Sequence, residues 1–183
     1  MKRIIVLILL IGLSCKRSNN EVVKISSEAK SEETVKANNT SNENFSLAIY
    51  DYDGLKPLLS KDDGKVHVVN FWATWCAPCI KELPYFENIN ENYKNKNVEV
   101  LLVSLDFPRQ YQTKLLPFLE KRDIKSKVVC FDDVDQNRWI PAINEDWSGA
   151  LPATIIYKGE KRKFYEQSFT QEALETELKQ FLN

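Results

Sequence analysis

The chain has 183 residues, of which 43% are hydrophobic, and its formal net charge is −1. A chain of this length and composition supports one medium-sized domain with its own hydrophobic core. Basic and acidic side chains are nearly balanced, and no basic patch is indicated, so the composition argues against a nucleic-acid-binding protein.

The amino-terminal segment has the pattern of a secretion signal. Residues 1–14 combine a short basic start with an apolar run that is too short to span a bilayer comfortably. Residues 12–15 resemble a bacterial lipoprotein processing site, so we expect cleavage before Cys15 and a lipid on that cysteine. Cleavage would remove Lys2 and Arg3 and change the formal charge from −1 to −3. The alternatives are an ordinary signal peptide and an uncleaved anchor, and all three put the domain outside the cytoplasm.

A polar segment follows the signal. Residues 16–44 are rich in Ser, Asn, Glu, Lys and Thr and lack aromatic residues. Such a segment cannot bury enough apolar surface to offset the entropy of ordering it. We therefore expect a lipidated amino terminus and a flexible tether over residues 15–44, and a folded domain over residues 45–183. The tether would give the domain reach, or it would be a disordered leader without a role.

The folded part begins with short elements ahead of one long buried strand. Phe45 to Tyr50 is predicted to be a strand, and Asp53 to Leu59 one or two helical turns. After a polar turn, the apolar run that starts at Val66 indicates a buried strand that delivers residues 76–79 to the start of a helix. His67 lies in this strand, where a packed or solvent-facing histidine is more common than a catalytic one.

Two cysteines separated by two residues carry the expected chemistry. At the beginning of a helix, unpaired N–H groups and the helix dipole stabilise a thiolate, which is the form that attacks a disulfide. Cys76 is therefore predicted to be the attacking thiol. Cys79, one helical turn further on, is predicted to be the resolving thiol that releases the partner. Pro78 suits the first turn because it has no N–H to leave unpaired.

A Cys-x-x-Cys pair can also form half of a zinc site, which needs two further ligands. The remaining candidates are Cys15, Cys130 and His67, and none of them forms a second closely spaced pair. The spacing therefore favours redox chemistry. We expect no metal, and no cofactor beyond the redox-active disulfide of Cys76 and Cys79.

Residues 71–79, Phe-Trp-Ala-Thr-Trp-Cys-Ala-Pro-Cys, resemble the active-site signature of the thioredoxin superfamily. With Asn70 before them and residues 81–84 after them, they are similar to the membrane-tethered, extracytoplasmic thiol:disulfide oxidoreductases of the TlpA/ResA type. The resemblance covers the whole expected domain. It implies an α/β thioredoxin fold, with a central mixed sheet flanked by helices and an insertion before the cis-proline strand. It also implies that Trp75 and Pro78 contact the substrate.

Asn70 and Glu82 bear on proton transfer. In thioredoxin, which this segment resembles, a buried aspartate occupies the position of Asn70 and handles the proton of the inner thiol. Asn70 is an amide and cannot take up a proton. Glu82 lies three residues after Cys79, on the same helical face, and a buried carboxylate beside a thiol can exchange a proton with it. TlpA/ResA-type proteins carry a glutamate at this spacing. The alternative is a solvated glutamate that pairs with Lys81 or Lys94.

Helices and strands alternate after this site. The first helix is expected to pack on the sheet with one apolar stripe and to kink at Pro84. Residues 98–105 are predicted to form a second buried strand, parallel to the first. A helix is predicted over residues 113–122 and a strand over residues 127–131. Cys130 in that strand is expected to be an inert small hydrophobic residue, although an exposed thiol there could trap the attacking cysteine.

A second functional segment precedes the next strand. By resemblance, the peptide between Leu151 and Pro152 is cis, faces the cysteines and leaves the preceding backbone free to pair with an extended substrate. The alternative is a trans proline that begins the strand. Trp147 and Tyr111 could line the substrate groove or simply pack in the core.

The remaining elements complete the expected order. Residues 138–140 are predicted to form a turn of helix, and residues 153–157 and 161–167 a hairpin. A helix over residues 170–182, with one apolar face, closes the chain.

The resemblance implies an extracytoplasmic thiol:disulfide oxidoreductase, and the absence of histidine between the cysteines favours a reductase. A membrane thiol donor would supply its electrons, and cysteine pairs in clients such as apocytochrome c would receive them. One rival function is a peroxiredoxin-like thiol peroxidase, which would need a hydroxyl side chain where Ala73 stands. The other is a non-catalytic binding module of the same fold.

Overall fold

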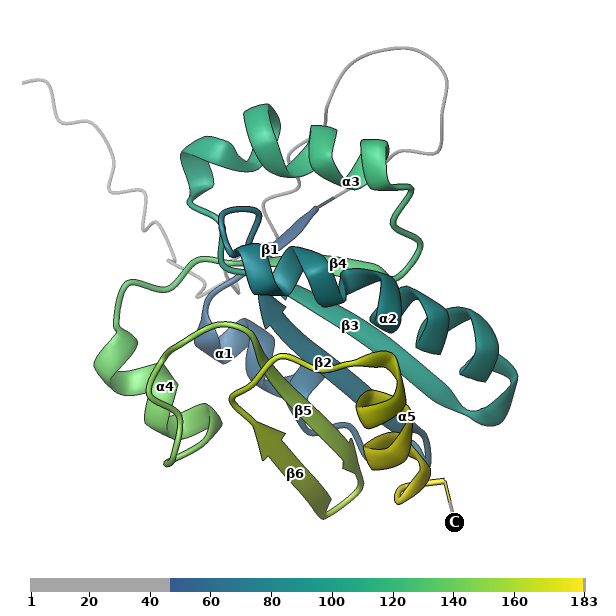
Figure 1. Cartoon of the computed structure of the whole chain (residues 1–183). Coiled ribbons are helices and arrows are strands. Elements are labelled where there is room, and N and C mark those ends of the chain that lie inside the picture. Colours follow the sequence, from purple (N-terminus) through teal and green to yellow (C-terminus); the bar gives the residue numbers. More distant parts are fainter. Residues whose placement is uncertain (1–46, 183) are drawn as a thin grey trace, which may run out of the picture. The chain divides into compact units, whose positions relative to one another are not determined.

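The computed structural model describes residues 47–182, and a six-stranded mixed sheet lies at the centre of this part of the chain (Figure 1). The strand order is β1-β4-β3-β2-β5-β6. Neighbouring strands from β1 to β2 are parallel, whereas β5 is antiparallel to β2 and β6 is antiparallel to β5. The strands are β1 (Ala48–Tyr50), β2 (Val66–Trp72), β3 (Val98–Ser104), β4 (Lys127–Phe131), β5 (Ala153–Lys158) and β6 (Lys161–Tyr165).

Helices cover both faces of the sheet (Figure 1). α2, α3 and α5 share one hydrophobic core with the sheet, and α1 and α4 share a second core on the opposite face. The helical elements are α1 (Tyr52–Leu55), η1 (Lys56–Leu59), α2 (Ala77–Tyr93), η2 (Lys94–Lys96), η3 (Pro108–Gln110), η4 (Tyr111–Leu115), α3 (Leu116–Arg122), α4 (Gln136–Ile143) and α5 (Gln171–Lys179).

β2 is the central strand, and all of its residues are buried. Because side chains alternate along a strand, Val68 and Trp72 enter the core beneath α2, whereas Val69 and Phe71 enter the core beneath α1 and α4. A strand covered on both faces needs a nearly continuous apolar run, which the sequence supplies. The predicted buried strand is therefore confirmed.

α2 packs its predicted apolar stripe against the sheet. Leu83, Phe86 and Ile89 are buried there, and burial of a side chain of this size stabilises the fold by about 1.5–3 kcal/mol. The helix continues through Pro84. After η2, Asn97 takes a left-handed conformation with φ of 56°, which turns the chain back into β3.

The predicted strands over residues 98–105 and 127–131 are confirmed as β3 and β4, and the hairpin as β5 and β6. Two helix boundaries differ from the prediction. The helix predicted to start at residue 113 begins two residues earlier as a π-helical turn at Tyr111. The closing helix begins at Gln171, because the side chain of Thr170 caps it by accepting a hydrogen bond from the N–H of Ala173, and it ends at Lys179.

The amino-terminal predictions fall on residues that lie outside the described part of the chain. They are the signal peptide over residues 1–14, the lipid on Cys15 and the tether over residues 15–44, and they stay predictions. Among residues 47–182, no helix is both long enough and apolar enough to cross a bilayer.

Candidate active site

Cys76 and Cys79 form a disulfide at the beginning of α2. Their accessibility differs, because Cys76 is 6% exposed and Cys79 is fully buried. Ala77 and Pro78, between them, are exposed. An incoming sulfur can therefore reach the pair only at Cys76.

The fold makes Cys76 the first group of the helix. Cys76 is the N-cap of α2, and its Sγ accepts a hydrogen bond from the N–H of Cys79 at 3.3 Å. When the disulfide opens, this N–H and the positive end of the helix dipole favour a thiolate on Cys76. The geometry thus matches the role predicted for the attacking thiol.

Glu82 lies one turn further along α2 and is fully buried. Its Oε1 accepts a hydrogen bond from Asn70 at 3.0 Å. Its Oε2 accepts from the hydroxyl of Ser168 at 3.1 Å and from the N–H of Phe169 at 2.7 Å. Burial raises the pKa of this carboxyl, although the three hydrogen bonds oppose the rise. The alternative of a solvated glutamate is wrong.

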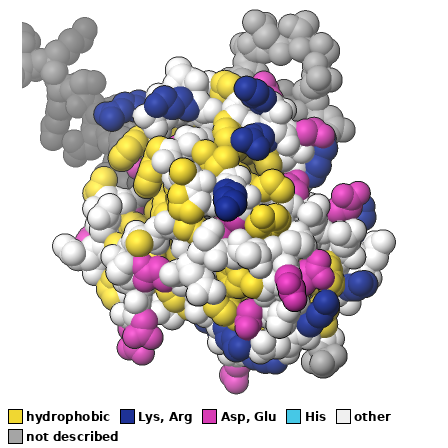
Figure 2. Space-filling view, viewed as in Figure 1, with side chains coloured by type: hydrophobic (Ala, Val, Ile, Leu, Met, Phe, Trp, Pro, Cys, Tyr) yellow, Lys and Arg dark blue, Asp and Glu magenta, His cyan; other side chains and the backbone are white. Residues whose placement is uncertain are grey.

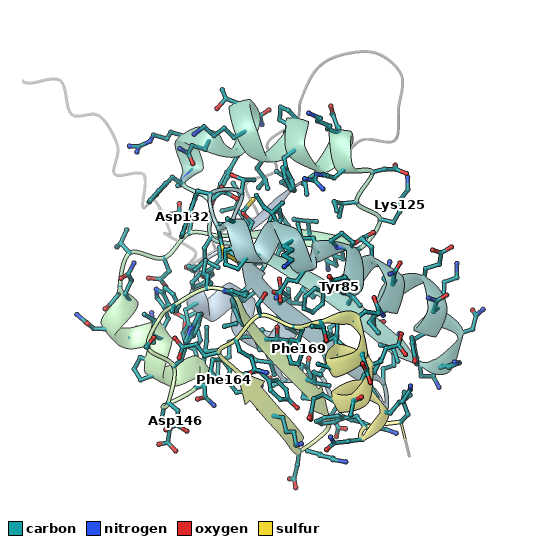
Figure 3. The ribbon with its side chains drawn as sticks, viewed as in Figure 1. Tyr85, Lys125, Asp132, Asp146, Phe164 and Phe169 are labelled. Atoms are coloured by element: carbon teal, nitrogen blue, oxygen red, sulfur yellow. A yellow bond between two sulfur atoms is a disulfide. The ribbon has the colours of Figure 1, made fainter. Side chains whose placement is uncertain are left out.

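Asn70 holds Glu82 in place rather than titrating itself. Its side-chain N–H groups donate to Glu82 and, at 3.1 Å, to the hydroxyl of Thr154 on β5. Ser168 and Phe169 come from the segment between β6 and α5, and Figure 3 labels Phe169 between α5 and α2. No local pattern predicts these two partners, because they lie far from Glu82 along the chain.

The peptide between Leu151 and Pro152 is cis, which confirms that prediction and excludes the trans alternative. Pro152 directly precedes β5, whose first residue, Ala153, pairs with Phe71 near the end of β2. The two strands therefore bring the proline segment to the end of the sheet where α2 begins.

Glu166, which the sequence analysis missed, holds the loop before this proline. Its carboxylate accepts hydrogen bonds from the N–H of Ser148 at 3.0 Å, from the N–H of Ala150 at 3.2 Å and from the hydroxyl of Ser148. These bonds lower the pKa of the Glu166 carboxyl. The loop that carries the backbone before the cis peptide is thus tied to the end of β6.

Trp147 and Tyr111 are both only 4% exposed, so both belong to the core. Trp147 packs against Phe71 and Phe164, and its indole N–H donates to the backbone oxygen of Ala150 at 2.9 Å. The packing alternative therefore holds for both residues. Trp75, by contrast, is 55% exposed and directly precedes Cys76.

Cys130 is fully buried in β4, and burial raises the pKa of its thiol to about 12. A thiol with this pKa is almost never ionised near neutral pH, so it is a poor nucleophile. The expectation of an inert residue is confirmed, and an exposed trap for Cys76 is excluded.

His67, one of the candidate zinc ligands, lies away from the cysteine pair. His67 lies at the opposite end of β2, where it stacks on Tyr157 and its Nε2 lies 2.9 Å from Asp63. His67, Asp63 and Glu99 place one possible metal-ligand atom each within 4.8 Å of one another. Lys61 and Lys65 both pair with Glu99, so positive charge is already present there.

Comparisons with known proteins agree with this site. Residues 35–162 match the AhpC/TSA family. The chain is 31% identical over 134 residues to the thiol-disulfide oxidoreductase ResA of Geobacillus kaustophilus, which covers 72% of each chain. It is 34% identical over 121 residues to ResA of Oceanobacillus iheyensis, which covers 64% of this chain but only 57% of that relative.

A solved thioredoxin-family thiol:disulfide interchange protein from Chlorobium tepidum has a TM-score of 0.56 to this chain at 16% identity. The match covers 85% of this chain and 100% of the other, and at this identity it speaks for the fold alone. The family match spans both the cysteine pair and the cis-proline segment. The chain therefore belongs to the AhpC/TSA family of the thioredoxin superfamily and has the thioredoxin fold.

Proposed function

We propose that the protein is a thiol:disulfide oxidoreductase that acts through Cys76 and Cys79. In the reduced form, the Cys76 thiolate attacks a client disulfide, forms a mixed disulfide and releases one client thiol. Cys79 then attacks the sulfur of Cys76, which releases the second client thiol and closes the enzyme's own disulfide. Two electrons pass from enzyme to client. The observation that carries this proposal is that Cys76 caps α2 and is 6% exposed, whereas Cys79 is fully buried.

Glu82 would take the proton that Cys79 must lose before it attacks. Glu82 is buried one turn after Cys79, and its carboxyl has a raised pKa. A buried base with a pKa nearer to neutrality is better matched to a thiol than a solvated carboxylate is. Asn70 and Phe169 would hold the carboxylate in place during the transfer.

The proposed direction is reduction of protein disulfides outside the cytoplasm. The site has Ala77 and Pro78 between the cysteines and so lacks a histidine there. The amino-terminal sequence supports export, with a lipid on Cys15 as the membrane attachment. The electrons would come from a membrane thiol donor, and the clients would be cysteine pairs of proteins such as apocytochrome c. Trp75, Pro78, Leu151 and Pro152 would contact the client.

Trapping the mixed disulfide tests the activity. In a Cys79→Ser variant the first attack survives and the resolving attack does not, so client proteins should accumulate covalently on Cys76. Non-reducing gels followed by mass spectrometry would identify them. Cys76→Ser is the matched control and should trap nothing, whereas Cys130→Ser in the Cys79→Ser background should trap as before.

The same variant separates the rival functions. A peroxiredoxin-like peroxidase would be oxidised by peroxide at Cys76 without accumulating clients, and Ala73 offers it no hydroxyl side chain. A non-catalytic binding module would retain clients without a covalent bond. Equilibration with glutathione tests the direction: we expect a potential closer to that of thioredoxin, about −270 mV, than to about −120 mV, the value of a strong disulfide-forming enzyme.

A further inference from the structure

Two exposed aromatic side chains lie together beside the reactive cysteine. Within residues 47–182, the large hydrophobic side chains that are mostly exposed are Trp75, Phe107 and Val134. The first two are stacked, with ring centroids 6.5 Å apart and an interplanar angle of 23°. Trp75 directly precedes Cys76 in the chain. Figure 2 shows hydrophobic side chains gathered over the beginning of α2, with basic side chains beside them.

A buried carboxylate fixes the backbones that carry both rings. Asp106 is only 1% exposed and accepts hydrogen bonds from the N–H and the hydroxyl of Thr74 and from the hydroxyl of Ser104. Trp75 directly follows Thr74, and Phe107 directly follows Asp106. The same set of hydrogen bonds therefore sets the spacing of the two aromatic residues.

A short turn fixes Phe107 from its other side. Pro108 restricts the backbone at the start of η3, and the N–H of Gln110 donates to the backbone oxygen of Phe107 at 2.7 Å. A surface held in this way loses little conformational entropy when a ligand binds. The two rings thus form a preformed platform rather than two independently mobile side chains.

Arg109 supplies a positive charge over the Phe107 ring of the platform. Its guanidinium carbon lies 5.3 Å from the centre of the Phe107 ring. Arg109 is exposed, and among residues 47–182 no carboxylate lies close enough to form an ion pair with it. An exposed guanidinium can bind a carboxylate with two hydrogen bonds.

We propose that Trp75, Phe107 and Arg109 form a client-selecting subsite that binds a bulky apolar side chain next to the client's cysteine and a carboxylate beyond it. This inference rests on the proposed oxidoreductase function and names the class of client segment. The client sulfur bonds to Cys76, so its neighbouring residue lies against the rings. Aromatic and arginine side chains at a desolvated contact commonly supply most of the binding energy, which is why these residues would select clients.

Rates with peptide disulfides test the subsite on the full-length, reduced protein. Each peptide carries one cysteine in a mixed disulfide with glutathione, flanked by Phe and Glu, by Ala and Glu, or by Phe and Lys. The enzyme is oxidised as peptide thiol and glutathione are released. Aromatic contacts of this kind predict that the wild-type rate is about fivefold higher for the Phe–Glu peptide than for the Ala–Glu peptide.

The variants are compared by rate ratios. Phe107→Ala should bring the ratio of Phe–Glu to Ala–Glu rates close to one. Arg109→Glu should reverse the preference for Phe–Glu over Phe–Lys. Val134→Ala, which removes the remaining exposed hydrophobic side chain, should leave both ratios unchanged. Thermal melting checks that each variant is folded.

The outcomes separate this inference from the function on which it rests. If the wild-type protein reduced none of the peptides, the proposed oxidoreductase function would fail. If it reduced all of them at equal rates, or if Phe107→Ala kept the wild-type ratio, the oxidoreductase would stand and the subsite would be overturned.

Discussion

Carboxyl groups lie near both ends of β2, but their surroundings shift their pKa values in opposite directions. At the amino end, His67 lies between Asp63 and Glu99, and Glu99 also pairs with Lys61 and Lys65. The two carboxylates are partly exposed, and pairing lowers their pKa values. For Asp63, the largest cause of the lowered pKa is the hydrogen bond with His67. For Glu99, it is the hydrogen bond with Lys65.

At the carboxyl end, Glu82 is fully buried and accepts hydrogen bonds only from neutral groups among residues 47–182. Burial therefore raises its pKa. Carboxyl groups near the two ends of one strand thus lie in different electrostatic surroundings. Pairing with histidine and lysine lowers the carboxylate pKa values at one end, whereas burial raises the pKa of Glu82 at the other.

The largest effect is expected when the proton acceptor proposed for Cys79 is removed. Glu82→Gln keeps the shape of the side chain, and we expect the resolving attack of Cys79 to slow by about 100-fold or more. Rapid mixing would follow the decay of a mixed disulfide between Cys76 and a test peptide. Glu99→Gln, at the other end of β2, is the matched control and should resolve at the wild-type rate. Equal rates in both variants would remove Glu82 from the mechanism.

The second prediction concerns the side chain that holds Glu82. Asn70→Ala removes one of the three hydrogen-bond donors to the buried Glu82 and the amide donor to the Thr154 hydroxyl, so we expect the free energy of unfolding to fall by about 1–3 kcal/mol. Urea denaturation measures this change. Asn90→Ala, a partly exposed amide on α2, should change the stability by less than about 0.5 kcal/mol. A similar small change at Asn70 would show that the bond to Glu82 is dispensable for folding.

The smallest expected effect is a difference in the sign of pH dependence. Glu82 has a raised pKa, so its contribution to stability is full below its unfolded value, about 4.5, and is lost as the pH rises through its folded value. Glu99 has a lowered pKa, so its contribution is full above about 4.5 and is lost as the pH falls through its folded value.

Unfolding free energies measured from pH 3 to pH 8 would check both signs. The wild-type advantage over Glu82→Gln should shrink as the pH rises above 4.5, while the advantage over Glu99→Gln should grow as the pH rises toward 4.5. The Glu99 effect should stay at or below about 1 kcal/mol, because its pairs are partly exposed. If the stability differences of the two variants changed with pH in the same direction, the opposite pKa shifts of Glu82 and Glu99 would be contradicted.

Local sequence was sufficient to predict the parts of the site that lie within one turn of each other. The spacing of Cys76, Cys79 and Glu82 fixes their common helix end and face, and the apolar run from Val66 requires a strand before them. The cis state of Pro152 followed from resemblance rather than from residue pattern.

The remaining contacts depend on pairing across the fold. Ser168 and Phe169 meet Glu82, and Asp106 meets Thr74, only after segments far apart in sequence come together. Nothing in the local sequence of either partner specifies the other. Trp147 was ambiguous for a related reason, since a tryptophan near a functional loop can pack inward or face a ligand, and tertiary packing decides between them.

The pairing of Ala153 with Phe71 joins segments that lie far apart in the chain. The cysteines follow β2, whereas Pro152 precedes β5 and is synthesised much later. Until these distant stretches join, the chain carries two ordinary thiols without their neighbouring proline. Contacts of such long sequence separation form slowly relative to local ones, so we expect the cysteine pair and the proline to meet only as the sheet assembles.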